Sequence, residues 1–329
     1  MIQINSIGDV LMSTPAIQSL KDRYGESEID VLTLKHTGAL LANNPSVKRL
    51  YRMSLDILGP LKERKYDLCI DLGGTFESVI WTLLSRADFT VGPERMLKRG
   101  VFSSGTGKFY DLSVTINEKH ITKRCLEIVR SIGCGIPEIR EKLFVSEQER
   151  SEGEAFLETS GLKGKSFAVL HPGTKWPPKR WPEENFAGLV KMLFDRKNII
   201  PVLVGSPGDI NMLKRIQEKS GVKESVLAPN LGLGALASVI DKASVFIGND
   251  SGPSHIAAAM NTPLVVLFGP TDPEASAPIS ENMKVLHDKI SCWPCTLYYR
   301  RDRCEKESNI CLQNIKPKDV LKSVKQVLE

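Results

Sequence analysis

The amino-acid sequence predicts an α/β protein whose parallel β-sheets are covered by helices. Short apolar runs alternate with stretches of helical spacing, which is typical of right-handed βαβ units. Polar, glycine-containing loops follow several of these runs, and ligands bind at such loops in α/β sheets. The 329 residues suffice for two domains, and the turn-rich segment 161–165 separates two alternating series. We therefore expect domains at residues 1–162 and 163–329, with a ligand cleft between them.

In the first domain, strands are expected where short apolar runs end at polar or glycine-rich turns. Helices are expected where apolar residues recur every three or four positions. These criteria give strands at 1–4, 29–34 and 68–72, and helices at 10–24, 55–64, 77–85, 121–132 and 147–159.

In the second domain, the same criteria predict another alternating series. They give strands at 167–170, 199–204, 245–247 and 264–268, and helices at 183–196, 209–219, 236–241 and 316–328. An Ala-rich helix is also expected after the strand at 245–247, with Pro253 at its first helical position.

The composition is that of an ordinary globular protein, with 41% hydrophobic and 25% charged residues. The formal charge of +5 (44 Lys and Arg minus 39 Asp and Glu) is no nucleic-acid signature, but it suits an anionic substrate or an anionic lipid surface. No apolar run reaches about 18 residues, and the N-terminus has no basic region followed by an apolar core. We therefore expect a cytoplasmic protein without a transmembrane helix.

The segment 245–260 predicts an anion site. A strand, a loop and an Ala-rich helix direct free backbone N–H groups and the positive end of a helix dipole at one point, and phosphate is the usual occupant. Asp250, Ser251 and His255 bring side chains to the same rim. A tight turn with Asp250 as a helix cap is the simpler alternative, but it would not need three such side chains.

Two further loops follow predicted strands. In loop 171–182, backbone amides, Thr174 and Lys179 can neutralise a diphosphate and an indole can shield it from water; a solvated Pro-rich loop is the alternative. In loop 205–209, Asp209 can accept hydrogen bonds from ribose hydroxyls or cap the next helix.

Asp9 follows the first strand in a strand-to-helix loop. A carboxylate there can act as a general base, and it can equally serve as a helix N-cap.

The seven cysteines fall into two groups. Cys69, Cys125 and Cys134 lie among apolar residues, which fits a reducing compartment. Cys292, Cys295, Cys304 and Cys311 begin with a C-x-x-C pair, so a zinc site, reduced structural cysteines and a disulfide all stay open.

Several motifs are missing from the sequence. It has no G-x-x-x-x-G-K-[ST] phosphate loop, no G-x-G-x-x-G, no G-x-S-x-G elbow, and no Asp-x-Asp pair to hold a divalent ion against a diphosphate.

Read together, the segments resemble the ADP-heptose:lipopolysaccharide heptosyltransferases of glycosyltransferase family 9. The similarity spans nearly the whole chain in the expected order. The matching segments are 6–11 with 14–17, 66–74, 171–173 with 179–182, 248–255, and 268–271.

The resemblance implies the GT-B fold, with two Rossmann-like domains that face each other across a cleft. It places the acceptor mainly on the N-terminal domain and the sugar nucleotide mainly on the C-terminal one. It also implies transfer with inversion and without a catalytic metal ion or a cofactor, since the ADP-sugar is a substrate.

The resemblance also assigns roles to residues. Asp9 looks like the catalytic base, and Gly8, Gly73 and Gly74 fall on the acceptor side. The donor contacts implied are Lys179 and Thr174 for the diphosphate, Asp250, Ser251, Gly252 and His255 for the sugar and phosphate, Asp209 for the ribose and Leu231 for adenine.

The leading hypothesis is therefore an inverting heptosyltransferase that uses ADP-heptose and a lipopolysaccharide core acceptor of the lipid A–Kdo type. Such an enzyme would work in the cytoplasm, with peripheral contact at the inner face of the inner membrane compatible with its charge. A sugar-nucleotide epimerase of similar fold and a non-catalytic nucleotide-sugar-binding protein of glycan assembly are the alternatives.

Overall fold

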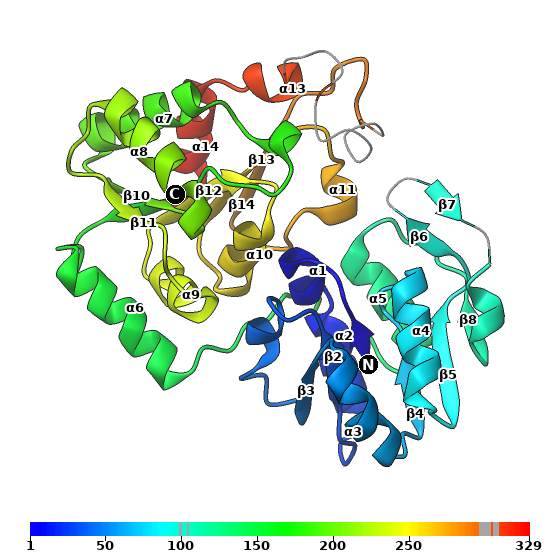
Figure 1. Ribbon diagram of the computed structural model, residues 1–329. Helices are drawn as coiled ribbons and strands as arrows, with labels where there is room; N and C mark the ends of the chain where they lie inside the picture. Colours follow the sequence, from blue (N-terminus) through cyan, green and yellow to red (C-terminus); the bar gives the residue numbers. More distant parts are fainter. Residues whose placement is uncertain (99–100, 104, 296–303, 305–308) are drawn as a thin grey trace. The chain divides into compact units, whose positions relative to one another are not determined.

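The structure is a computed structural model that describes residues 1–98, 101–103, 105–295, 304 and 309–329 (Figure 1). It consists of two compact units, unit 1 (Met1–Phe144) and unit 2 (Val145–Glu329). The sequence instead predicts a division after residue 162. The two divisions differ because helix α6 (Glu147–Thr159) packs against α9 (Leu233–Asp241) and so belongs to unit 2.

Unit 1 contains two three-stranded parallel sheets, which a bridge between Ile2 and Asp71 joins. The strand order is therefore β3-β2-β1-β4-β5-β8. The bounds are β1 (Ile2–Gln3), β2 (Asp30–Thr33), β3 (Arg49–Arg52), β4 (Leu68–Ile70), β5 (Phe89–Pro93) and β8 (Leu112–Val114), with an antiparallel hairpin of β6 (Met96–Lys98) and β7 (Val101–Ser103). The sequence predicts β1, β2 and β4, and it misses the other strands of this unit.

The helices of unit 1 follow the predicted series with one exception. Their bounds are α1 (Ile7–Met12), α2 (Thr14–Arg23), α3 (Leu58–Glu63), α4 (Phe76–Ser85) and α5 (Ile121–Arg130), with 3₁₀ turns at η1 (Gly38–Leu41), η2 (Leu55–Ile57) and η3 (Gly107–Phe109). The single helix predicted at 10–24 is wrong, because the chain forms α1 and α2 there. Pro15 has no N–H to donate to the Leu11 carbonyl, and the Thr14 hydroxyl donates to that carbonyl instead, at 2.6 Å.

Unit 2 contains a six-stranded parallel sheet in the order β11-β10-β9-β12-β13-β14. The bounds are β9 (Phe167–His171), β10 (Ile200–Val204), β11 (Val226–Ala228), β12 (Val245–Asn249), β13 (Leu264–Phe268) and β14 (Met283–His287). From β9 the chain adds β10 and β11 on one side, and it then returns to add β12, β13 and β14 on the other. The sheet is thus a doubly wound one, as the alternating pattern predicts, although β11 and β14 lack a clear signal in the sequence.

The helices of unit 2 cover both faces of this sheet (Figure 1). After α6 come α7 (Glu183–Lys197), α8 (Ile210–Ser220), α9, α10 (Gly252–Ala259), α11 (Pro273–Ser276), α13 (Ile310–Gln313) and α14 (Pro317–Leu328), with 3₁₀ turns at η4 (Pro177–Lys179) and η5 (Pro207–Asp209).

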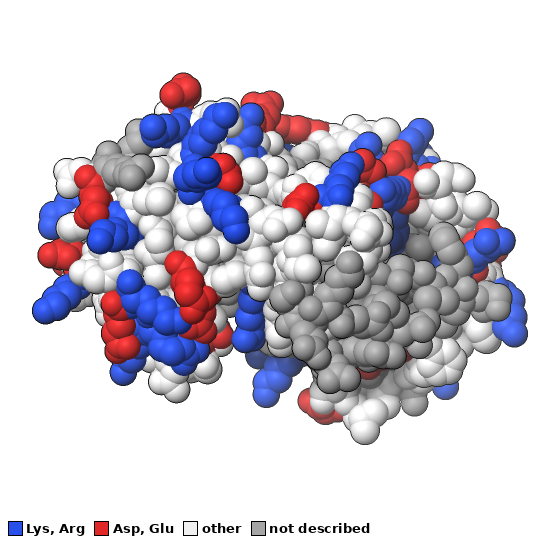
Figure 2. Space-filling model, turned by 90° about the horizontal axis from the view of Figure 1, so that it is seen from above, with Lys and Arg blue, Asp and Glu red and all other residues white. Residues whose placement is uncertain are grey.

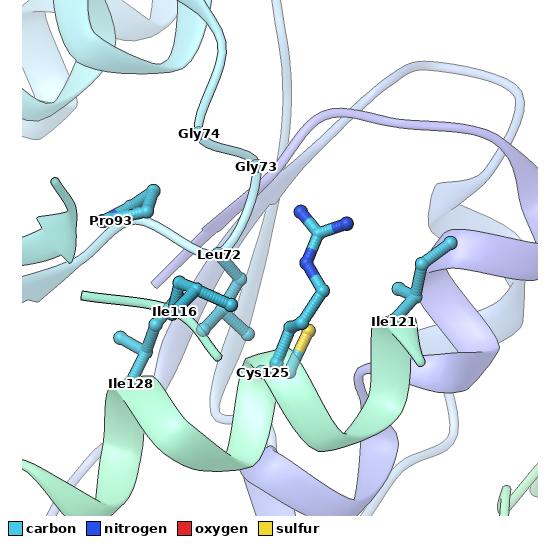
Figure 3. A pocket seen from close by; sticks show the side chains of 9 residues that line it. Leu72, Gly73, Gly74, Pro93, Ile116, Ile121, Cys125 and Ile128 are labelled. Atoms are coloured by element: carbon cyan, nitrogen blue, oxygen red, sulfur yellow. The ribbon is translucent and has the colours of Figure 1, made fainter. Parts of the chain in front are cut away.

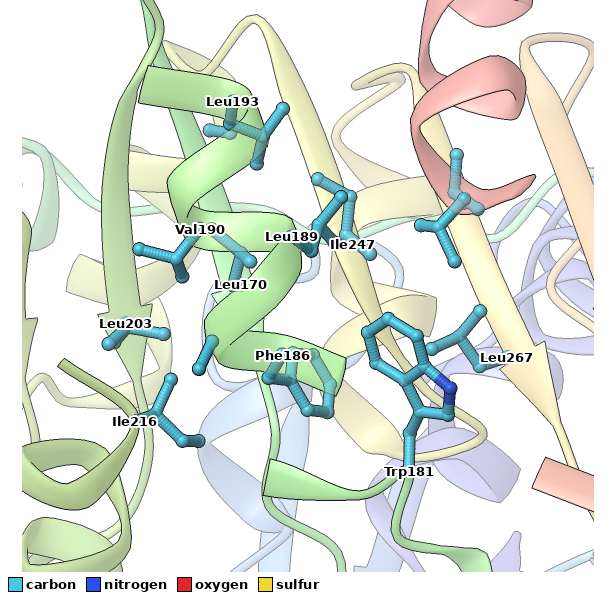
Figure 4. Close-up of a cluster of buried hydrophobic side chains, with 14 of the residues drawn as sticks. Leu170, Trp181, Phe186, Leu189, Val190, Leu193, Leu203, Ile216, Ile247 and Leu267 are labelled. Carbon is cyan, nitrogen blue, oxygen red and sulfur yellow. The ribbon is translucent and has the colours of Figure 1, made fainter. Parts of the chain in front are cut away.

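One face of the sheet forms a large apolar core with α7, α8 and α14. Figure 4 shows Leu189 and Leu193 of α7 directed toward side chains of the strands, among them Ile247. Trp181 lies in the same cluster, 2% exposed, and its indole N–H donates to the Ile315 carbonyl at 2.9 Å. Its ring also meets Phe186 edge to face, with centroids 4.8 Å apart. Trp181 is therefore a core residue, which leaves Trp176 as the indole of loop 171–182 that is not buried.

Within the described part of the chain, no helix combines the length and the apolar composition that crossing a membrane requires. On the face shown in Figure 2, Lys and Arg side chains are interspersed with Asp and Glu side chains.

Candidate functional site

The candidate donor site lies at the carboxyl ends of β9 and β12. These strands are neighbours, with His171 paired to Gly248, and the direction in which strands are added reverses between them. Loops that leave such a switch point run to opposite faces of the sheet and open a crevice between them. Loop 172–182 follows β9, and the loop at Asp250 and Ser251 follows β12 and leads into α10. Half of the eight predicted donor residues lie on these two loops, and Gly252 and His255 follow in α10.

Asn249, the last residue of β12, holds the two loops together. Its side chain is fully buried, and its amide group donates to the Pro172 carbonyl at 2.8 Å. Its side-chain oxygen accepts from the Trp181 N–H at 3.0 Å. Both ends of loop 172–182 are thus fixed to β12. The sequence does not single out Asn249, because an asparagine at a turn has many uses.

Asp250 and Lys179 form a largely buried ion pair. Lys179 Nζ lies 2.5 Å from Asp250 Oδ2, and the two side chains are 14% and 7% exposed. The Thr271 hydroxyl, from the loop after β13, donates to the same oxygen at 2.5 Å. A lysine, an aspartate and a threonine from three loops are therefore brought together, and Lys179 and Asp250 were predicted as donor contacts.

Helix α10 begins beside this ion pair. Ser251 is its N-cap residue in an extended conformation. Pro253 is its second helical residue, one position later than predicted, because the helix begins at Gly252. The positive end of the helix dipole and free backbone N–H groups therefore lie at Ser251 and Gly252, where they favour an anion. His255 is buried in the same helix, 3% exposed.

His171 ends β9 directly below the loops and is buried. Its Nδ1 is hydrogen-bonded to Ser251 Oγ at 3.1 Å. Burial lowers the pKa of His171 to about 4, and the nearby carboxylate of Asp209 opposes that shift only in part. The imidazole is therefore neutral at pH 7 and serves as a hydrogen-bond partner without charge. The sequence contains His171 in a matching segment but does not assign it a role.

Asp209 lies at the end of η5, close to the loop after β9. A Cβ atom added to Gly173 would lie 3.2 Å from Asp209 Oδ2, so a side chain there would press on this carboxylate. The Asp209 Oδ2 atom accepts hydrogen bonds from the Ser206 N–H at 2.8 Å and the Ser206 hydroxyl at 2.6 Å. These bonds form the capping box of η5, whereas the Asp209 side chain makes no capping bond to α8, so the predicted cap of the next helix is not observed. The role at a ribose stays a prediction.

Thr174 and Leu231 are both half-buried. Thr174 follows β9, its hydroxyl oxygen accepts from the Trp176 N–H at 3.3 Å, and its carbonyl accepts from the Arg180 guanidinium at 2.9 Å. Leu231 lies in the loop between β11 and α9. Both residues therefore lie at the carboxyl edge of the sheet, and their donor contacts stay predictions.

Asp9 lies inside α1 in unit 1 and not in a loop, contrary to expectation. Helix α1 begins with a capping box, in which Ser6 is the N-cap and Asp9 the third helical residue. Asp9 Oδ2 accepts from the Ser6 N–H at 3.0 Å and from the Ser6 hydroxyl at 2.6 Å. Asp9 Oδ1 has no hydrogen-bond partner among the described residues. One carboxylate oxygen therefore orients the side chain, and the other is available to take a proton.

Gly73 and Gly74 form the turn after β4 around a buried carboxylate. Their N–H groups donate to Asp71 Oδ1 at 2.7 and 3.1 Å. The hydroxyls of Ser78 and Tyr110 donate to Asp71 Oδ2 at 2.6 and 2.7 Å. Burial raises the pKa of Asp71, and these four donors oppose that rise. The turn is thus rigid, and its amides are already used, so an acceptor would meet other atoms of Gly73 and Gly74.

A pocket of unit 1 borders this turn (Figure 3). It is lined by Leu72, Gly73, Gly74, Pro93, Ile116, Ile121, Arg124, Cys125 and Ile128. Among the described residues that line the pocket, Arg124 is the only charged one. The sequence gives no sign of this role, because α5 has the pattern of an ordinary amphipathic helix. Gly8, the remaining residue predicted on the acceptor side, is buried in α1.

The four C-terminal cysteines differ in exposure. Cys292 is exposed, Cys295 and Cys304 are half-buried, and Cys311 is buried. Among the residues described, no group of three or more His, Cys, Asp or Glu side chains is arranged to hold a metal ion. All four are free thiols, and much of the segment between Cys295 and Cys311 lies outside the described residues.

Comparison with known proteins identifies the class. Among solved structures, E. coli ADP-heptose lps heptosyltransferase II superposes with a TM-score of 0.80 at 24% identity, over 99% of this chain and 97% of that one. E. coli heptosyltransferase WaaC with ADP superposes with a TM-score of 0.74 at 21% identity, over 99% and 98%. These likenesses in fold confirm a GT-B protein, built from two Rossmann-like α/β units.

The family follows from the sequence comparisons. The family model of glycosyltransferase family 9 (heptosyltransferase) matches residues 56–305. Lipopolysaccharide heptosyltransferase 3 of Escherichia coli is 26% identical, over 98% of this chain and 96% of that protein. Because the model matches more than half of the chain, the chain belongs to glycosyltransferase family 9. The comparisons support a glycosyltransferase, and they support neither the epimerase nor the non-catalytic binding protein.

Proposed function

We propose that this family 9 glycosyltransferase transfers heptose from ADP-heptose to an inner-core acceptor of lipopolysaccharide, with inversion at the anomeric carbon and without a catalytic metal ion. The similar proteins are named lipopolysaccharide or ADP-heptose heptosyltransferases. The observation that carries the proposal is the ion pair of Lys179 and Asp250 at the switch point of unit 2, beside the N-terminus of α10.

In the proposed donor complex, the diphosphate lies against Lys179 and the first turn of α10. A lysine and a helix N-terminus supply the positive charge that a divalent ion supplies in other transferases. Asp250 holds Lys179 in place before the donor arrives, and its remaining oxygen faces a sugar hydroxyl. Thr174 adds a phosphate contact, and Asp209 and Leu231 meet the ribose and adenine at the ends of β10 and β11.

In the transfer step, Asp9 Oδ1 takes the proton of the acceptor hydroxyl. The hydroxyl oxygen then forms a bond to the anomeric carbon from the face opposite ADP, and the bond between that carbon and the diphosphate oxygen breaks with its electron pair on ADP. Attack from the opposite face inverts the anomeric centre. Negative charge grows on the departing diphosphate, so Lys179 and the α10 amides stabilise the transition state more than the ground state.

The decisive experiment replaces the proposed base. Asp9→Asn keeps a side-chain oxygen that Ser6 can still donate to, but it cannot take a proton. We expect transfer to fall by at least about 100-fold, as for loss of a general base, while the affinity for ADP stays unchanged. Ser6→Ala is the matched control, because it removes a capping bond and leaves the carboxylate. Unchanged turnover in Asp9→Asn would remove Asp9 from the mechanism.

Two simpler assays test the remaining parts of the proposal. In a thermal-shift series of nucleoside diphosphates, ADP is expected to stabilise the protein most, because stabilisation follows affinity for the native state. Transfer is expected to continue in a chelator. Conversion of the nucleotide sugar without any acceptor would instead support the epimerase.

We also propose that unit 1 contacts the lipid surface in which such an acceptor is anchored. On α4, Phe76, Ile80 and Leu83 are 63%, 41% and 52% exposed, and their spacing places them on one side of the helix. Arg86, at the end of the same helix, is exposed as well, and a cation next to apolar side chains suits an anionic lipid surface.

A further inference from the structure

The loop after β13, residues 269–272, is fixed by the chain that follows β14. The indole N–H of Trp293 donates to the Thr271 carbonyl at 3.2 Å. The backbone N–H of Cys295 donates to the Pro270 carbonyl at 2.8 Å. Two consecutive peptide groups of loop 269–272 therefore have their direction set by hydrogen bonds from outside the loop.

Thr271 connects this loop with the ion pair of the candidate donor site. It is 7% exposed, and its hydroxyl donates at 2.5 Å to Asp250 Oδ2, the oxygen that also accepts from Lys179. Threonine branches at Cβ, so the direction of its side chain is strongly restricted once its backbone is fixed. A hydrogen bond to the Thr271 carbonyl therefore also sets where the Thr271 hydroxyl points.

The indole of Trp293 is itself held at the edge of the sheet. Its ring stacks on His287, the last residue of β14, with centroids 5.5 Å apart and planes inclined by 30°. His287 pairs with Phe268, the residue just before loop 269–272. The Trp293 backbone N–H donates to the Ile290 carbonyl at 2.9 Å, and the ammonium group of the exposed Lys289 lies 5.1 Å from the ring centroid. The ring is thus a fixed donor beside the loop.

We propose that Trp293 is a positioning residue of the donor site. Through the Thr271 carbonyl it directs the Thr271 hydroxyl at Asp250, and it thereby fixes the carboxylate that holds Lys179. Since Thr271 and Lys179 share Asp250 Oδ2, the orientation of the carboxylate as a whole depends on both bonds. This inference rests on the proposed function, because it concerns the site at which the donor diphosphate is expected. Trp293 touches neither the donor nor the reacting atoms.

Two other roles of Trp293 would give different results. A purely structural role changes the free energy of unfolding and leaves the Kd for ADP unchanged. Direct stacking on the donor changes that Kd whether or not the Thr271 hydroxyl is present. The proposed role changes the Kd only through this hydroxyl, so the effects of substitutions at the two residues cannot add up.

The test is a double-mutant cycle in the full chain, with ADP as the probe in calorimetric titration. Trp293→Phe keeps an aromatic ring against His287 and removes the indole N–H. Thr271→Val keeps the shape of the side chain and removes the hydroxyl. We expect each single variant to raise the Kd for ADP about 3- to 10-fold, as for the loss of one hydrogen bond. The double variant should bind ADP no more weakly than Thr271→Val alone.

Kinetics give a second readout that a purely structural role would not move. With ADP-heptose and a core oligosaccharide, kcat/KM for the donor should fall in Trp293→Phe by at least the same factor, while KM for the acceptor stays unchanged. Lys289→Met is the matched control, because it removes the charge over the ring and leaves the indole N–H with its bond. It should bind ADP and turn over as the wild type does.

Three results would overturn the inference: a wild-type Kd for ADP in Trp293→Phe, effects of the two substitutions that add in the double variant, and a loss in Lys289→Met equal to that in Trp293→Phe. Should Trp293→Phe fail to fold, the tryptophan analogue with sulfur in place of the indole N–H removes the same donor and keeps the ring size. Failure of the proposed function is read from the wild type alone. If it binds ADP without transferring heptose, only the reaction is wrong and the cycle still decides the role of Trp293; if it binds no ADP, both are overturned.

Discussion

Replacing Lys179 with methionine tests the donor site most directly, because one side chain serves two purposes there. In the structure it neutralises Asp250 across 2.5 Å, and in the proposed complex it also contacts the diphosphate. Methionine keeps the length and packing of the side chain and removes the charge. The substitution should therefore weaken ADP binding and, separately, leave a buried carboxylate without its cation.

The two effects have different magnitudes. Breaking a fully buried ion pair costs about 3–5 kcal/mol. Here the loss should be about 1–3 kcal/mol, because the Thr271 hydroxyl still donates to Asp250 and the α10 N-terminus lies close by. A charged hydrogen bond to phosphate contributes about 1.5–3 kcal/mol, so the Kd for ADP should rise about 10- to 150-fold.

A second substitution separates these effects. Lys179→Met combined with Asp250→Asn removes both charges, so stability should return toward that of the wild type while ADP binding stays weak. Urea unfolding gives the stability, and calorimetric titration gives the Kd. Lys175→Met is the matched control, because Lys175 is exposed on the same loop and lies over the Trp176 ring. Wild-type affinity for ADP in Lys179→Met would refute the site, and equal loss in Lys175→Met would show that any cation of the loop suffices.

Two further results are expected. Burial lowers the pKa of His171 to about 4, whereas this pKa is about 6.5 in an unfolded chain. Between these two pH values the unfolded state therefore binds a proton that the folded state does not bind. The contribution of His171 to stability is fully present above pH 6.5, and the free energy of unfolding falls by about 3 kcal/mol as the pH drops to about 4. Urea unfolding at several pH values should show this fall in the wild type and a smaller one in His171→Asn, and parallel curves would contradict the assignment. Substituting Phe76 and Leu83 with serine should reduce flotation with anionic vesicles and leave transfer to a soluble acceptor intact; flotation equal to that of the wild type would exclude α4 as the lipid contact.

The sequence determined the features that depend on short-range patterns. The alternation of apolar runs with stretches of helical spacing was sufficient to predict the doubly wound sheet of unit 2. The strand–loop–helix pattern was sufficient to predict where α10 begins, to within one residue. Elements without a local pattern were missed, such as β11 and β14, because short strands at or near a sheet edge need no continuous apolar run. The break between α1 and α2 was missed too, although Pro15 is its visible cause.

Only the tertiary structure decided how the candidate residues are used. Lys179 and Asp250 are separated by 71 positions, and they meet because the sheet places β9 beside β12. Asp9 and Asp209 each form a capping interaction with a serine three residues earlier, which the sequence permits but does not require. Arg124 has no distinguishing neighbours in the sequence, and only the packed side chains show that its Nε atom is buried with no hydrogen-bond partner among the described residues. Local patterns fix which elements form, whereas the pairing of charges depends on which elements become neighbours.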